Sequence, residues 1–147
     1  MYNRIVKIFL RLALSTAFLS AVADRFGLYP SEMSAWGNWK SFLEYTSLIN
    51  PWFPPSITPG LATIATVAEI ILGLFLLLGL KTELMAKLSG YLLLLFALSM
   101  TFSLGIKTPF DYSVFSASAA AFSLSLIKEK FYELDALISR NQASVLS

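Results

Sequence analysis

The chain has 147 residues, of which 56% are hydrophobic and 14% are charged, and its formal net charge is +2. Soluble domains carry about 25% charged residues, and one this small could not bury so much apolar side chain, so the composition indicates a membrane protein with one domain, residues 1–147. The small net charge argues against nucleic acid as a partner, and the absence of Cys and His excludes thiol chemistry and the usual metal ligands, so no metal site is expected.

Four apolar segments are long enough to cross a membrane, which takes about 20 residues at a rise of about 1.5 Å per residue. They cover residues 5–23, 61–80, 84–106 and 110–127. Thr58-Pro59 and Thr108-Pro109 are typical of helix starts, with threonine as the N-cap and proline at the first helical position. Asp111 completes a capping box with Thr108. The sequence therefore predicts an all-α membrane protein built as a bundle of four transmembrane helices.

Lys and Arg residues are divided unevenly between the two sides of the predicted bundle. One side has Arg4, Lys7, Arg11, Lys81, Lys87, Lys128, Lys130 and Arg140, and the other has Arg25, Lys40 and Lys107. Positive residues concentrate on the cytoplasmic side of membrane proteins. We therefore expect a multi-pass protein with its N- and C-termini in the cytoplasm and its first connection outside.

The first connection, residues 24–57, forms an outer loop that is rich in aromatic residues. Connections of more than about 12–15 residues are usually functional or disordered, and this one lacks the composition of a disordered segment. Trp36, Trp39 and Leu43 have the spacing of one face of a short helix. We expect this helix to lie in the membrane interface over the outer mouth of the bundle and to end at Asn50-Pro51. It is either an aromatic belt that anchors the loop or a lid over a ligand pocket.

Residues 128–140 form a polar tail in which Phe131, Leu134 and Ile138 recur at helical spacing. This amphipathic pattern is typical of a helix that lies on a membrane surface. The tail is predicted either to extend the fourth helix or to lie on the inner surface.

Glu69 is a carboxylate near the middle of the second apolar segment. Such residues usually face the interior of a bundle and have a partner there. The residues on the same helical face are small, which allows close approach of another helix; they are Ala62, Ala65, Thr66 and Gly73. Arg11 is the best candidate for a cationic partner, so we predict an Arg11–Glu69 pair. Two alternatives remain open: Arg11 reaches the inner headgroups instead, or Glu69 is a structural clamp and not a ligand, proton or quinone site.

Four polar residues are predicted at the outer end of the bundle, where they can meet beneath Trp36 and Trp39. They are Asp24 and Arg25 at the end of the first helix, and Asp111 and Tyr112 at the start of the fourth. A carboxylate, a guanidinium and a phenol beneath aromatic rings suit the polar head of a quinone or lipid. The alternative is that they are ordinary helix-end and capping residues. No histidine is present to activate a serine, so no catalytic residue is assigned.

Several stretches resemble the DoxX family of small bacterial membrane proteins. They are Arg11-Leu-Ala-Leu-Ser, Asp24-Arg25-Phe-Gly, Ala68-Glu69-Ile-Ile-Leu-Gly73 and Gly105-Ile-Lys-Thr-Pro-Phe-Asp-Tyr-Ser-Val-Phe115. The resemblance implies a four-helix protein of the bacterial inner membrane, associated with quinol oxidase or thiosulfate:quinone oxidoreductase complexes or with other redox partners. It carries over to Arg11, Glu69 and Asp111, and less closely to Asp24 and Arg25.

We therefore expect an accessory subunit that binds a quinone or lipid-like ligand and supports a membrane redox complex; whether it catalyses a reaction itself is left open. The candidate ligand-binding residues are Arg11, Asp24, Arg25, Trp36, Trp39, Glu69, Asp111 and Tyr112. No covalently bound cofactor is expected, and the expected partners are membrane lipid, quinone, and redox subunits or further copies of the chain. One alternative is a structural or assembly protein without a ligand. Another is a small transporter or lipid-modifying enzyme in which Glu69 carries a proton.

Overall fold

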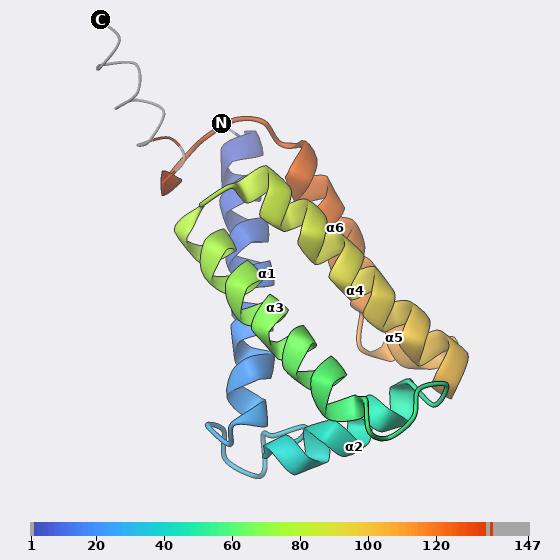
Figure 1. The fold of residues 1–147 in the computed structure, drawn as a ribbon. Helices are drawn as coiled ribbons and strands as arrows, with labels where there is room; N and C mark the ends of the chain where they lie inside the picture. Colours follow the sequence, from blue (N-terminus) through green and yellow to red (C-terminus); the bar gives the residue numbers. More distant parts are fainter. Residues whose placement is uncertain (1, 135, 137–147) are drawn as a thin grey trace, which may run out of the picture.

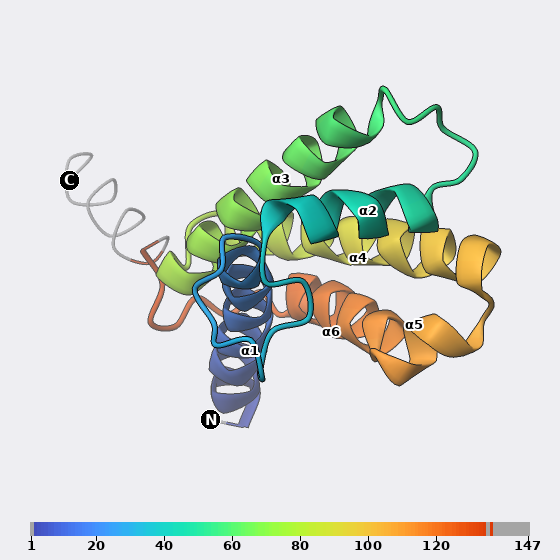
Figure 2. The same ribbon diagram turned by 90° about the horizontal axis from the view of Figure 1, so that it is seen from below.

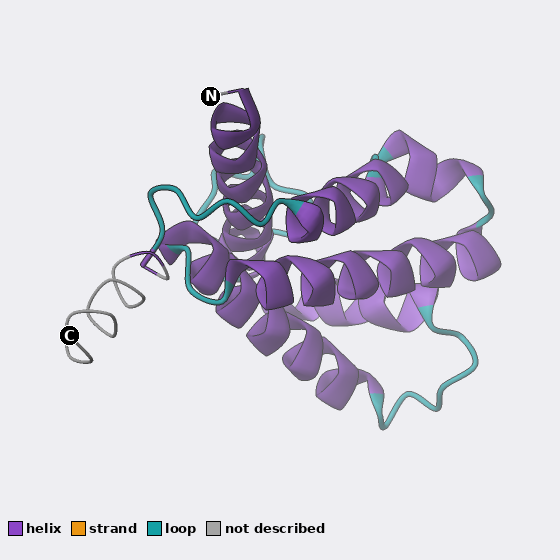
Figure 3. Ribbon diagram, turned by 90° about the horizontal axis from the view of Figure 1, so that it is seen from above, coloured by secondary structure: helices purple, strands orange, loops and turns teal. Residues whose placement is uncertain are grey.

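The computed structural model describes residues 2–134 and 136, and within them the fold is built from helices without strands (Figure 3). In chain order the helices are α1 (Tyr2–Arg25), α2 (Trp39–Ile49), α3 (Thr58–Leu78), α4 (Thr82–Leu104), α5 (Lys107–Asp111) and α6 (Val114–Leu126). The predicted all-helical fold is confirmed for this part of the chain.

Three helices are long and apolar enough to cross a membrane, namely Asn3–Arg25, Thr58–Leu78 and Thr82–Leu104. Their outward faces carry large apolar side chains such as Phe9, Ile64 and Phe102, which suits a lipid environment. The prediction of a membrane protein with transmembrane helices is therefore supported for three segments.

The predicted fourth helix, residues 110–127, is divided in two. α5 ends at Asp111, and α6 begins only at Val114. Between them Ser113 has a φ of 55°, and its backbone N–H donates to the carbonyl of Phe110 at 3.0 Å. This turn interrupts the helix because a left-handed residue cannot continue a right-handed one. Hydropathy does not reveal this turn, because the turn depends on the backbone conformation of the single residue Ser113.

The four long helices form two antiparallel pairs, α1 with α3 and α4 with α6 (Figure 1). We call the end where α1 begins and α3 leads into α4 the basic end, and the end where α1 stops and α3 begins the aromatic end. α2 lies across the aromatic end and contacts both α3 and α4 (Figure 2). The apolar core lies between the pairs; its members are Leu14, Phe18, Leu72, Leu76, Met85, Ala86, Ala121 and Leu124.

The predicted small-residue face of α3 is buried against α1. Ala62, Thr66 and Gly73 are buried on the same face as Glu69. A Cβ atom at Gly73 would lie 3.0 Å from the side chain of Leu19 on α1, so a larger residue there would require Leu19 to shift by a few tenths of an ångström. The prediction that Glu69 points into a seam between helices is confirmed.

The helix expected in the outer loop is present as α2, but it begins later than predicted. Asn38 is its N-cap, and the Asn38 side chain accepts a hydrogen bond from the Ser41 backbone N–H at 2.9 Å. Trp36 therefore lies before the helix, and the predicted face of Trp36, Trp39 and Leu43 is wrong. The buried residues of α2 are Phe42, Thr46 and Ile49. The helix ends at Asn50 as predicted.

After Leu126 the chain leaves the helical conformation and crosses to the start of α1. We call residues 128–133 the tail segment. Because it is not helical and contacts Arg4, Lys7 and Arg11, the predicted extension of the fourth helix is wrong. The described part of the tail lies over the basic end instead. Residues 135 and 137–140 of the predicted tail lie outside the described residues.

Candidate functional site

Arg25 and Glu69 form a buried ion pair between α1 and α3. Arg25 is the last residue of α1, and Glu69 lies midway along α3. Their side chains are only 3% and 4% exposed. The Nη1 atom of Arg25 also donates to Oγ1 of Thr66 at 2.8 Å, one turn before Glu69. The three side chains form a polar cluster that joins the two helices within an apolar seam; we call it the aromatic-end cluster.

Aromatic side chains from the outer loop cover the guanidinium of Arg25. Its Cζ atom lies 3.8 Å from the ring centroid of Phe42 and 5.2 Å from that of Trp36. The Trp36 ring meets Phe42 edge to face at 5.2 Å and lies 5.8 Å from Tyr45. Cation–π attraction strengthens where water is excluded. The rings therefore both shield Arg25 and stabilise its charge.

We call the rings of Phe42 and Trp36 the aromatic roof. Trp39 and Tyr45 pack against this roof, and their rings do not contact Arg25. Trp39 stacks on Phe26 at 6.1 Å and contacts Phe42 at 5.6 Å, so it supports the roof from outside. Burial, with a further contribution from the phenol of Tyr112, raises the pKa of Tyr45 above its ordinary value. The side chain of Tyr112 is exposed, so it does not line the buried cluster.

Asp24 fixes the loop that carries Trp36. Its carboxylate accepts hydrogen bonds from the hydroxyl of Ser34 and from the backbone N–H groups of Ala35 and Trp36, the last two at 3.0 and 2.9 Å. Hydrogen bonds to an ionised acceptor are stronger than neutral ones. Asp24 thus holds Trp36 over Arg25, the residue that follows Asp24 in the sequence.

Two buried atoms of the cluster keep unused hydrogen-bonding capacity. Nε of Arg25 has no hydrogen-bond partner within the described part of the chain, and Oε2 of Glu69 has none besides its ion pair with Nη1 of Arg25. Buried polar atoms are normally hydrogen-bonded, so each exception needs a physical explanation. The cluster therefore offers one donor and one acceptor beneath the aromatic roof.

The predicted pair of Arg11 and Glu69 is wrong. Arg11 donates from Nε to the carbonyl of Leu76 at 3.0 Å and from Nη2 to that of Leu77 at 3.1 Å, at the opposite end of α3. The relative position of the helices explains this. Gly73 faces Phe18, and Arg11 and Arg25 lie two turns to either side of Phe18. Arg25 therefore reaches Glu69, whereas Arg11 reaches the end of α3.

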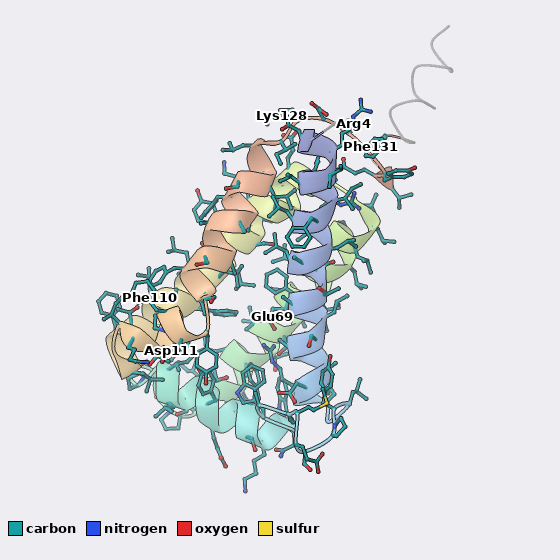
Figure 4. All side chains as sticks on the ribbon, turned by 180° about the vertical axis from the view of Figure 1, so that it is seen from behind. Arg4, Glu69, Phe110, Asp111, Lys128 and Phe131 are labelled. Carbon is teal, nitrogen blue, oxygen red and sulfur yellow. The ribbon has the colours of Figure 1, made fainter. Side chains whose placement is uncertain are left out.

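The predicted meeting of Asp111 with Asp24 and Arg25 is also wrong. Asp111 is exposed and pairs with Lys107 on its own helix at 2.6 Å. Figure 4 shows Asp111 on the outside of α5, away from Glu69. The turn at Ser113 directs α5 outward, which separates Asp111 from the buried cluster. Of the eight candidate residues, the structure brings together Asp24, Arg25, Trp36 and Glu69, with Trp39 packed outside the roof.

No protein-family model, curated protein or solved structure matches the chain.

Sequence reasoning missed two contributors to the cluster and a second cluster at the basic end. Thr66 was seen only as a small residue, and Phe42 was overlooked, although Phe42, Thr46 and Ile49 have the spacing of one helical face. At the basic end Lys7 pairs with Glu133 at 2.9 Å, and both side chains are almost fully buried. No sequence pattern signals this pair because it depends on the path of the tail segment.

A surface groove on the described part of the chain lies apart from the aromatic-end cluster. This open groove of about 610 Å³ runs along α1, lined by Ala13, Thr16, Ala17, Leu19, Ser20, Ala23 and Tyr29. None of the predicted site residues lines it, so we give the buried cluster more weight than the groove. The described residues hold no group of three His, Cys, Asp or Glu side chains that could bind a metal ion.

Proposed function

We propose that the chain crosses a bacterial inner membrane four times, with its basic end on the cytoplasmic side. α6 has 13 residues, which cover about 20 Å, so the fourth crossing needs α5 in addition. The tail segment contacts the start of α1, and two ends on one side require an even number of crossings. The concentration of Lys and Arg at the basic end supports the orientation.

Membership of the DoxX family is part of this proposal and rests on the four stretches of sequence given above. Two of them supply the residues that meet at the aromatic end: Asp24-Arg25-Phe-Gly provides Arg25, and the stretch around Glu69 provides its partner. This pairing gives the two stretches a shared role. The protein would then be an accessory subunit, without a covalently bound cofactor, that supports a membrane redox complex.

In this proposal the aromatic-end cluster binds the polar head of a quinone or of a lipid-like molecule. The observation that carries it is the buried Nε of Arg25, which has no hydrogen-bond partner among the described residues; Oε2 of Glu69, ion-paired with Nη1 of Arg25, keeps a further lone pair. A carbonyl oxygen of a quinone accepts a hydrogen bond from Nε, and a hydroxyl of the reduced form donates one to Oε2. The rings of Trp36 and Phe42 offer flat apolar surfaces for a quinone ring.

Tryptophan fluorescence tests the ligand, because Trp36 lies at the cluster and Trp52 is exposed elsewhere in the loop. Two matched variants each keep one of these residues: W39F/W52F retains Trp36, and W36F/W39F retains Trp52. Titration with a short-chain quinone in detergent should quench Trp36 saturably, whereas Trp52 should lose intensity only in proportion to the quinone added. Equal quenching of the two proteins, or none that saturates, would contradict quinone binding at the cluster.

A structural role is the second candidate, and it is favoured by the contacts that Arg25 already makes. Arg25 joins Glu69, Thr66 and the rings of the outer loop, and so fixes the end of α1 against α3. In this role the cluster sets helix positions for assembly with a protein partner and holds no ligand. It predicts a stoichiometric protein partner in mild-detergent extracts and no saturable quenching of Trp36.

A further inference from the structure

Two cations are buried at the basic end of the bundle. Lys7 is 1% exposed and Arg11 is 5% exposed. Both face the carboxylate of Glu133, with Nζ of Lys7 2.9 Å and Nη1 of Arg11 3.8 Å from Oε1. Buried charges require a counter-charge. The carboxylate of the tail segment supplies it here, so the two cations together form a site that an anion occupies.

Arg11 is held in place independently of Glu133. Its Nε and Nη2 atoms donate to the carbonyls of Leu76 and Leu77, which are among the last of α3. These carbonyls lack partners within the helix and lie at the negative end of its dipole, so they bind a cation well. Gly79 allows the approach, because a Cβ there would lie 2.7 Å from Nη2 of Arg11. Arg11 therefore keeps its position if the tail segment moves.

The tail segment contacts the two cations through its backbone as well as through Glu133. Nζ of Lys7 donates to the carbonyl of Glu129 at 2.5 Å, and Nη1 of Arg11 donates to that of Tyr132 at 2.7 Å. The segment makes two further ion pairs near the surface, Lys128 with Glu83 at 2.6 Å and Arg4 with Glu129 at 3.5 Å. All four side chains are about half exposed or more, and such pairs contribute little and are screened by salt. Tyr132 has a φ of 46°, which is uncommon outside glycine. When the tail segment lifts, Arg11 keeps its two hydrogen bonds to α3, and Lys7 loses the two contacts that the segment provides.

A hollow of about 300 Å³ adjoins Lys7 and Glu133. Its lining includes the lysines Lys7, Lys81 and Lys130 and the carboxylates of Glu83 and Glu133. Glu83 is already neutralised by Lys128, and Glu133 by Lys7. The hollow lies where α3 ends and α4 begins, which are the ends of two candidate membrane spans. An anion there would lie at the level of lipid headgroups.

We propose that Lys7 and Arg11 form a binding site for a phosphate group, and that Glu133 occupies this site until the tail segment lifts. Phosphate oxygens accept hydrogen bonds from ammonium and guanidinium groups as a carboxylate does, and they provide more acceptors. The phosphate belongs either to an anionic lipid headgroup or to a free ion. The site lies at the opposite end of α1 from the aromatic-end cluster and does not depend on its function.

Glu133→Gln in the full chain tests the proposal, with Glu129→Gln as the matched control. Both remove one carboxylate from the tail segment, but only Glu133 contacts the buried cations through its side chain. Binding of phosphatidylglycerol to the protein in detergent, followed by native mass spectrometry, should strengthen about tenfold for E133Q and stay unchanged for E129Q. Adding Lys7→Gln to E133Q should abolish the gain. Competition by millimolar inorganic phosphate would identify a free ion as the ligand, and its absence would identify the lipid headgroup.

Equal binding by E133Q and the wild type, or an equal rise in E133Q and E129Q, would overturn the proposal. A second variant covers the case in which E133Q does not fold. The chain has no native cysteine, so Arg4→Cys and Phe131→Cys can be joined by a short crosslinker across a contact of 4.9 Å. Crosslinking should lower phosphatidylglycerol binding severalfold relative to the uncrosslinked double variant. Unchanged binding would show that the tail segment does not cover the site.

Discussion

The two ends of α1 each carry a buried cation–carboxylate cluster, but the carboxylates are held in different ways. At the aromatic end Glu69 lies on a long helix and faces Arg25 beneath the rings of Phe42 and Trp36. At the basic end Glu133 lies on a segment without helical structure, flanked by ion pairs that reach the surface. At the aromatic end the ion pair thus joins two helices, whereas at the basic end it joins one helix to the tail segment.

This difference separates two uses of a buried charge. The Arg25–Glu69 pair cannot open unless α1 and α3 separate, and that would expose the apolar seam around Gly73. The contact of Glu133 with Lys7 can open while every helix stays in place. The first cluster is therefore suited to fixing a position or orienting a ligand, and the second to exchange between two occupants.

The largest expected effect is the loss of one partner at the aromatic end. Glu69→Gln leaves Arg25 buried without a counter-charge, which typically costs about 3–5 kcal/mol of unfolding free energy. Equilibrium unfolding in mixed detergents measures it. The double variant R25Q/E69Q should lose less unfolding free energy than the sum of the losses of the two single variants, because contacting residues are coupled.

Arg11→Gln provides the matched control for this coupling. Its side chain contacts Leu76 and Leu77, not Glu69. The effects of R11Q and E69Q on unfolding free energy should therefore add, as they do for distant sites. Additive effects for Arg25 with Glu69, or clear coupling for Arg11 with Glu69, would contradict the pairing seen in the structure.

A somewhat smaller loss is expected at the basic end for Gly79→Ala. Gly79 has a φ of +69°, and an added Cβ would lie 2.8 Å from Cα of Glu133 as well as close to Arg11. Left-handed backbone and overpacking together should lower the unfolding free energy by about 2–4 kcal/mol. Gly60→Ala is the control, because nothing lies within 4 Å of its Cβ position and its φ is not positive. G60A should change stability by less than about 1 kcal/mol.

The aromatic roof should contribute less than the ion pair that it covers. Trp36→Ala removes one of two rings beside Arg25 and should cost about 1–2 kcal/mol. Trp52→Ala, at an exposed position of the same loop, should be close to neutral. Thermal unfolding followed by circular dichroism compares them. Equal melting temperatures would mean that the Trp36 ring adds nothing measurable to the stability of the cluster.

The sequence was sufficient for the three long helices α1, α3 and α4 and for the inward direction of Glu69, because these depend on local pattern. Apolar runs mark α1, α3 and α4, and the small residues beside Glu69 mark the face that packs. The partner of Glu69 could not be predicted in the same way. It depends on which residue of α1 lies opposite Gly73. That residue is Phe18, and Arg11 and Arg25 lie two turns before and after it, so the relative position of α1 and α3 decides which arginine reaches Glu69.

The basic-end cluster was beyond sequence reasoning for a related reason. Helical spacing in the tail groups Phe131 and Leu134 as apolar and assigns Glu133 to the polar face. The tail segment is not helical, however, and this turns Glu133 inward to Lys7. The preference of two buried cations for a carboxylate overrides a weak amphipathic pattern. A local period cannot represent such a long-range contact.

The smallest expected effect concerns the surface links of the tail segment. Lys128→Ala removes the pair with Glu83, whose side chains are 71% and 46% exposed for Lys128 and Glu83. The unfolding free energy should fall by less than about 0.5 kcal/mol, and less again in high salt, because exposed pairs are weak and screened. E133Q, measured beside it, should cost clearly more, because it leaves Lys7 and Arg11 buried without their counter-charge. A larger loss for K128A than for E133Q would mean that the surface pair with Glu83, and not the buried contact of Glu133 with Lys7, holds the tail segment. The basic end would then be an ordinary charged surface.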